Sequence, residues 1–193
     1  MNNLRAFIAI EIPTAIKEAI AKLSAGLQTA AGQTVRWVSP ANTHLTLKFI
    51  GEIPPAAVDP IAQMLQLECR SQPAFEISVS RAGCFPNPQR ARIIWVGLQS
   101  PQDLAQLQQR IEAGAARLGI AAEDRPFSPH LTIGRVRPLL SPEQQQTLQM
   151  ALTALPQVTE LGKFTVRSVT LFKSELRPAG ALYTTLFNAR LGG

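Results

Sequence analysis

Cysteine, histidine and charge of either sign are all scarce in this sequence: it has two cysteines, two histidines and only 17% charged residues. Cys69 and Cys84 are too few for a disulfide framework and form no C-x-x-C pattern, so we expect reduced, buried thiols. No stretch approaches the roughly 18 apolar residues that a membrane-spanning helix needs. The apolar run near the start is too short for a signal peptide. We therefore expect a cytoplasmic protein without membrane contact.

Long blocks of like charge and flexible linkers are also missing, while 46% of the 193 residues are hydrophobic. This composition excludes a disordered chain and predicts a single domain over residues 1–193. The net charge of +6 comes mostly from arginine, with 14 Arg against 5 Lys. A planar guanidinium suits phosphate better than a point charge does. A compact basic protein of this kind points to a nucleic-acid or nucleotide partner. No interface stripe is visible, so we expect a monomer.

Apolar spacing predicts helices and strands in irregular alternation, which is typical of an α+β fold with mostly antiparallel sheets. Turn residues divide the segments, and a polar loop is expected between the last two strands, over Ser174–Gly180. The expected helices cover residues 13–30, 57–69, 102–117 and 141–155. The expected strands cover residues 5–11, 34–38, 44–50, 75–79 with an extension to 84, 93–98, 130–136, 164–173 and 183–191.

One short segment occurs twice. His44-Leu45-Thr46-Leu47 recurs as His130-Leu131-Thr132-Ile133, 86 residues later, and these are the only histidines in the chain. Each copy lies on an expected strand followed by a helix. Two copies are too few for a solenoid. They predict two similar lobes that face one another across a cleft.

A strand turns successive side chains to opposite faces. The histidine and threonine of each copy therefore share one face, which we expect to line the cleft, while the apolar residues join a core. An imidazole with a pKa near 6.5 can accept or donate a proton at neutral pH, and each such role typically contributes 10²–10⁴-fold in rate. Threonine hydroxyls can donate to phosphate oxygens. The pattern predicts phosphodiester chemistry at His44, Thr46, His130 and Thr132.

Simpler readings of the two copies exist. A strand histidine is often only a packed or surface residue, and two histidines could recruit carboxylates to hold a metal. Zinc generally takes three or four protein ligands, and neither copy contains a carboxylate. We therefore expect no metal and no cofactor.

Two basic residues lie just after the copies. Lys48 has the parity of His44 and Thr46 and could reach the same cleft. Arg135 lies five residues beyond His130, which places it on the opposite face unless the strand ends or bulges at Gly134.

The paired motifs resemble the 2H phosphoesterase superfamily, and more closely the bacterial RNA 2',3'-cyclic phosphodiesterase family, also called 2'-5' RNA ligases. The likeness covers nearly the whole chain and is carried by the segments 5–13, 37–51, 83–88, 92–97, 127–135 and 174–176. The resemblance implies an α+β bilobal fold of two pseudo-symmetric lobes, each with a small, mostly antiparallel sheet and flanking helices, with a cleft between them. The same resemblance implies the metal-free hydrolysis of a terminal 2',3'-cyclic phosphate to a 2'-phosphate. It also implies that His44 donates a proton to the leaving 3'-oxygen and that His130 accepts one from water. The residues alone do not assign these two roles.

Several residues around the motifs are candidates for substrate binding, although packing is the competing role for the aromatic ones. RNA with 2',3'-cyclic phosphate ends and small nucleotides are the expected partners. A 2'-5' ligase as the main activity and a non-catalytic RNA- or nucleotide-binding module are the alternatives. The candidates for phosphate are Arg90, Arg92, Arg135, Arg137 and Lys48, and those for base stacking are Trp37, Phe85 and Phe127.

Overall fold

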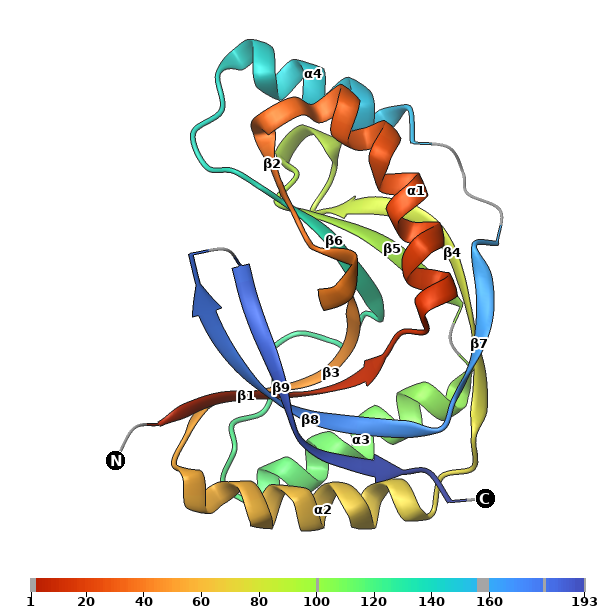
Figure 1. Ribbon diagram of the computed structural model, residues 1–193, viewed down its shortest axis with the longest axis vertical. Coiled ribbons are helices and arrows are strands. Elements are labelled where there is room, and N and C mark those ends of the chain that lie inside the picture. The colour runs from red at the N-terminus through yellow and green to blue at the C-terminus, as the bar shows by residue number, and fades with distance from the viewer. Residues whose placement is uncertain (1–2, 100, 156–159, 179, 193) are drawn as a thin grey trace.

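The chain folds into two lobes, each built on one antiparallel sheet that is flanked by two helices (Figure 1). The computed structural model describes residues 3–99, 101–155, 160–178 and 180–192. Every strand pairing in both sheets is antiparallel. The expected bilobal α+β fold is therefore confirmed. No helix within the described ranges is both long and apolar enough to cross a membrane.

The first sheet has four strands in the order β3-β1-β8-β9, and we call it sheet A. Two helices pack against it, α2 through β8 and β9 and α3 through β3. The elements of this lobe are β1 (Leu4–Glu11), β3 (His44–Ile53), α2 (Val58–Arg70), α3 (Gln102–Arg117), β8 (Ser168–Arg177) and β9 (Gly180–Arg190).

The second sheet, sheet B, has five strands in the order β2-β6-β5-β4-β7. Helix α1 packs on β2 and β7, and α4 packs on α1. The chain passes between the lobes several times, so neither lobe is one half of the sequence. The elements of this lobe are α1 (Thr14–Ala31), β2 (Val35–Trp37), β4 (Phe75–Phe85), β5 (Ile93–Gln99), β6 (His130–Val136), α4 (Pro142–Thr153) and β7 (Gly162–Val166).

One hydrophobic core runs through both lobes and holds the apolar residues of the motif strands. Leu45 and Leu131 are fully buried, and Leu47 and Ile133 are nearly so. Complete burial of one such side chain stabilises the fold by about 1.5–3 kcal/mol. The alternation expected from the sequence therefore holds at the start of both motif strands, and the leucines fix which face each histidine occupies.

The structure differs from expectation near the C-terminal end in two places. The expected strand 164–173 is two strands, β7 in sheet B and β8 in sheet A, separated at Arg167. The pairing shows the break: residues up to Val166 pair with β4 in sheet B, whereas β8 pairs with β1 and β9 in sheet A, where residues 169–172 are all buried.

The expected polar loop over residues 174–180 is mostly strand, because β8 and β9 form a hairpin that runs out to Arg177 and Gly180. Polar residues suit this hairpin end, where side chains such as Arg177 are exposed. Ala179 lies outside the described residues.

Candidate active site

Each histidine is the first residue of its strand and is held by the same hydrogen bond. The Nδ1 atom of His44 lies 2.8 Å from the carbonyl oxygen of Asn42, and Nδ1 of His130 lies 2.7 Å from that of Ser128. A carbonyl oxygen can only accept, so both Nδ1 atoms carry the proton and donate it. The Nε2 atom of each neutral ring is then left with a free lone pair. Strands β3 and β6 contact each other, which brings the two motifs together.

The segment before His44 is fastened to two other elements. It is a short 3-10 helix, Pro40–Asn42. Lys17 of α1 donates from Nζ to the carbonyl oxygen of Ala41 at 3.0 Å. The Asn42 side chain donates from Nδ2 to the carbonyl oxygen of Ala181 on β9 at 2.7 Å. The carbonyl group that orients His44 is therefore fixed from both lobes.

Both motif strands bulge at the same motif position. In β3, Thr46 pairs with Ala9 and Lys48 with Ile8, so Leu47 is the extra residue. In β6, Thr132 pairs with Trp95 and Gly134 with Ile94, so Ile133 is the extra residue. A bulge inserts one residue and reverses the facing of the residues after it, in β3 as far as a second bulge at Ile50. We call the face of each sheet that carries the motif histidine and threonine the motif side.

The bulges decide which of the next residues along each strand reach the motif side. Arg135 pairs with Ile93 and returns to the side of Thr132, as expected for a bulged strand. Lys48 turns to the helix side, where it is 1% exposed, so the expectation that it reaches the cleft is wrong. Phe49 takes the motif side instead, opposite Phe7, and is 54% exposed. Strict alternation of side chains without the bulges would place Arg135, Lys48 and Phe49 each on the wrong face of its sheet.

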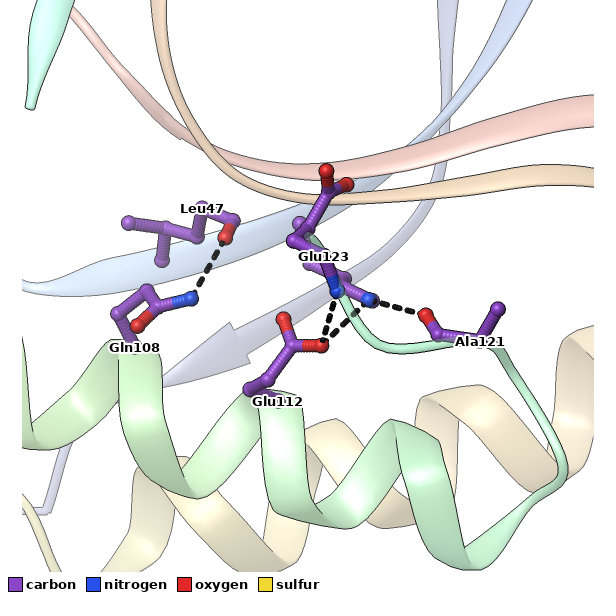
Figure 2. Close-up of polar contacts among 6 residues, drawn as sticks. Leu47, Gln108, Glu112, Ala121 and Glu123 are labelled. Atoms are coloured by element: carbon purple, nitrogen blue, oxygen red, sulfur yellow. Dashed lines mark hydrogen bonds and ion pairs between the residues drawn. The ribbon is translucent and has the colours of Figure 1, made fainter. Parts of the chain in front are cut away.

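Buried Lys48 connects the two motifs through contacts on the helix side of sheet A, opposite the motif side. Its Nζ donates to Glu112 Oε1 and to the carbonyl oxygen of Ala121, both at 2.6 Å. The same Glu112 oxygen accepts from the backbone N–H of Glu123 at 3.1 Å, as Figure 2 shows. Ala121 and Glu123 belong to the segment between α3 and β6 that leads to His130. Lys48 and Glu112 therefore tie the first motif strand to the approach to the second motif.

Aromatic rings surround each histidine differently. The His44 ring lies 4.7 Å from that of Phe7 and 5.1 Å, edge-on, from that of Tyr183. The His130 ring lies edge-on to that of Phe85 at 5.2 Å, and the Phe85 ring lies 5.1 Å from that of Trp95. His44 therefore has aromatic neighbours from β1 and β9, while the one ring beside His130 comes from β4.

Burial lowers the pKa of His44 below its ordinary value, although the hydrogen bond to Asn42 opposes this. The charges of Lys17 and Arg135 lower the pKa further. The Arg135 charge also acts on Tyr183, whose pKa burial raises. Arg135 comes from sheet B, and both groups that feel it belong to sheet A. This guanidinium therefore lies where the motif sides of the two sheets meet.

The remaining candidates pack against the core or are exposed at a strand end. Trp37 pairs with Gly134, on the face opposite the motif side, and packs against the core. Phe127 also packs partly against the core. Arg92 is exposed just before β5. The sequence interpretation missed Phe49 and also Arg36, which pairs with Arg135 on the motif side. Only knowledge of the bulge could have placed Phe49.

The groups nearest the two imidazoles include one carboxylate, because Glu11 of β1 pairs with His44 in the register of sheet A. Among the described residues, no three His, Cys, Asp or Glu side chains gather in a way that could hold a metal ion. What the arrangement offers is two imidazole Nε2 atoms, two hydroxyl groups and one guanidinium. These groups suit proton transfer and the binding of an anion.

Comparison with known proteins agrees with this geometry. The LigT-like phosphoesterase family matches twice, over residues 10–95 and 96–183, and the chain belongs to this family. The RNA 2',3'-cyclic phosphodiesterase of Methanothermobacter thermautotrophicus is 34% identical over 98% of this chain and 100% of its own length. The protein of the same name from Escherichia coli is 37% identical over 68% of this chain and 71% of its own length.

Solved structures agree as well. The crystal structure of E. coli LigT complexed with 3'-AMP matches with a TM-score of 0.78 and 28% identity, covering 99% of both chains. The structure of the same protein complexed with NADP+ matches with a TM-score of 0.77 and 26% identity over 100% of both chains.

Proposed function

We propose that this protein hydrolyses the 2',3'-cyclic phosphate of RNA ends, or of small nucleotides, to a 2'-phosphate without a metal ion. Relatives along the whole chain carry the name of this activity, and the solved neighbours were captured with nucleotides. The observation that carries the proposal is the duplicated anchoring of His44 and His130. Each imidazole is fixed through Nδ1 and keeps Nε2 free beside a threonine on the motif side.

In the proposed reaction, His130 Nε2 accepts a proton from water while the water oxygen attacks phosphorus. The bond from phosphorus to the 3'-oxygen breaks, and protonated His44 Nε2 gives its proton to that oxygen. The products are a 2'-phosphate and a free 3'-hydroxyl group. The roles of the two histidines follow the family resemblance. Thr46, Thr132 and Arg135 would donate to the non-bridging oxygens, where negative charge grows.

The lowered pKa of His44 sets a condition on this scheme. In the free protein at neutral pH, His44 is mostly neutral, whereas a proton donor must start protonated. A bound phosphate brings negative charge close to the ring and raises its pKa. We therefore propose that His44 gains its proton as the substrate binds, and that burial then favours release of the proton to the leaving oxygen.

Phe49 is the proposed site for the base. Its ring is exposed on the motif side, three residues beyond Thr46, and no other large apolar side chain of β3 is exposed. Stacking of a base on an aromatic side chain contributes about 1–3 kcal/mol and tolerates any sequence. Nucleotides of different bases would therefore bind with similar affinity.

The test is hydrolysis of nucleoside 2',3'-cyclic phosphates and of an oligonucleotide with a cyclic phosphate end, in the presence of EDTA. We expect turnover, a bell-shaped pH profile and a 2'-phosphate product. Loss of activity to the chelator would indicate a metal enzyme, and a 3'-phosphate product would contradict the leaving oxygen proposed here. Joining of RNA ends without hydrolysis would favour a 2'-5' ligase. Saturable binding without any product would favour a binding module.

A further inference from the structure

The motif side of sheet A continues beyond His44 and Phe49, and its register orders it in rows. Phe49, Phe7 and Phe172 lie side by side in one row. The next row holds Arg5, with Ser174 and Tyr183 on one side of it and Glu52 on the other. Two residues along a strand span about 6.6 Å. The row beside the aromatic one therefore carries one cation, Arg5, and one anion, Glu52, at a spacing of roughly the length of one nucleotide.

Arg5 is free to act in this row. Its side chain is exposed. It takes part in none of the ion pairs formed among the described residues, although Glu52 lies opposite it on β3. The small side chain of Ser174 separates it from Tyr183, and the Arg5 charge still acts on the Tyr183 hydroxyl. Tyr183 in turn touches the His44 ring. The Tyr183 ring therefore connects Arg5 with His44.

Beyond Arg5 the surface becomes apolar again. Leu176 lies two residues past Ser174 on β8, on the motif side, and is 75% exposed. The sequence along this face is therefore the aromatic row, then the Arg5 cation, then an apolar side chain. A single strand of RNA presents bases and phosphates in the same alternation, and proteins bind it by combining positive charge with apolar or aromatic surfaces.

We propose that Arg5 binds the phosphodiester that joins the terminal nucleotide to the preceding one, so that the site accepts an RNA strand and not only a nucleotide. This inference rests on the proposed function, with the cyclic phosphate between the two motifs and the terminal base on Phe49. The next phosphate toward the 5' end then reaches the Arg5 row, and the preceding nucleoside lies over Leu176. Glu52 opposes this binding by its charge.

The test compares Arg5→Gln with the unchanged protein on two substrates, a nucleoside 2',3'-cyclic phosphate and a short oligonucleotide with the same terminal nucleotide. We expect KM for the oligonucleotide to rise about two- to five-fold, as for loss of one exposed charged contact. KM for the nucleoside substrate should stay unchanged. The logarithmic salt slope of oligonucleotide binding should fall by about 0.7, which corresponds to one phosphate on single-stranded nucleic acid.

Lys173→Gln is the matched control, because Lys173 pairs with Ala6 on the opposite face of the same strands. It should leave both substrates unaffected. Glu52→Gln should lower KM for the oligonucleotide only. Equal effects of Arg5→Gln on both substrates, or no effect on either, would overturn the proposal.

Binding of a 2'-phosphate-ended oligonucleotide, followed by fluorescence anisotropy and compared with a 2'-nucleotide, gives a readout independent of turnover. Wild-type protein that binds but does not hydrolyse would count against the proposed function. In that case, a selective loss of oligonucleotide binding in Arg5→Gln would still support the proposed role of Arg5, and unaltered binding would refute it.

Discussion

The two motif strands share their chemistry and differ in the residues beyond it. His44 and His130 begin their strands, are anchored through Nδ1 to a carbonyl group two residues earlier, and are followed by a threonine and then a bulge. After the bulge, the residue that returns to the motif side is Phe49 in β3 and Arg135 in β6. Repetition thus supplies two similarly anchored imidazoles, and under the proposed function the divergence after each bulge gives the base to β3 and the phosphate to β6.

The residue that turns away from the motif side differs as well. In β3 it is Lys48, which reaches Glu112 and the segment leading to β6. In β6 it is Gly134, where an added Cβ would lie only 2.7 Å from Cγ1 of Val35. In sheet B this position has no room for a side chain, because Val35 fills the space. In sheet A the same position carries Lys48, whose ion pair with Glu112 connects the two motifs.

The largest expected effect comes from removing either imidazole. His44→Ala and His130→Ala should each lower kcat by about 10²–10⁴-fold, because each ring supplies one proton transfer. The double variant should be scarcely worse than the single ones, since the two residues act as a unit. Steady-state hydrolysis measures this, with thermal unfolding as the control for folding. Near wild-type turnover in either single variant would break the equivalence of the two strands.

Lys48→Met tests the link behind the motifs. Removing one partner of a buried ion pair destabilises a protein by about 3–5 kcal/mol, because the other charge is left unpaired. The double variant Lys48→Met, Glu112→Leu should recover much of this stability, as measured by urea unfolding.

The matched control for Lys48 is Lys163→Met, whose exposed ion pairs with Glu76 and Glu160 have N–O distances of 3.9 and 3.7 Å. Its loss should cost less than about 1 kcal/mol. A Lys48→Met variant as stable as this control would show that the buried pair does not hold the two strands together.

Arg135→Ala and Phe49→Ala should separate the two recognition roles. Removing one preorganised donor to the transition state typically costs about 10²–10³-fold in kcat, so Arg135→Ala should act mainly on kcat. Phe49→Ala should raise KM about ten-fold through lost stacking. Full kinetic curves on one nucleoside cyclic phosphate measure both, and the reverse pattern would contradict the division of roles. Arg117→Ala, on the outer surface of α3, is the control.

The smallest expected effect is the pH dependence of His44. Because its pKa is lowered in the folded protein, the folded state binds fewer protons than the unfolded state below about pH 6.5. Stability should therefore fall as the pH drops from 6.5 through the lowered pKa. His44→Gln should remove this contribution, as measured by urea unfolding at pH 7.5 and 5.5. An NMR titration of free protein that shows His44 at or above its ordinary pKa would refute it.

Sequence reasoning reached the class of fold and the four motif residues because period-two alternation and a duplicated motif are local signals. It failed at Lys48 and Phe49 because a bulge depends on the hydrogen bonds of the neighbouring strand. Arg135 was placed correctly only under the condition that its strand bulged. The break at Arg167 was missed because residues 164–173 contain no glycine or proline to mark it, and only the pairing of the two segments in different sheets shows it.

The proposed roles of the two histidines are opposite, because His130 accepts a proton from water and His44 donates one to the leaving 3'-oxygen. The most direct test replaces the 3'-oxygen of the cyclic phosphate by sulfur. A thiolate leaves without protonation, since a thiol is a much stronger acid than a hydroxyl group. His44→Ala should then regain most of the wild-type rate on the sulfur substrate, while His130→Ala should remain inactive. Recovery by His130→Ala and not by His44→Ala would reverse the assigned roles, and recovery by neither would contradict a proton donor at His44.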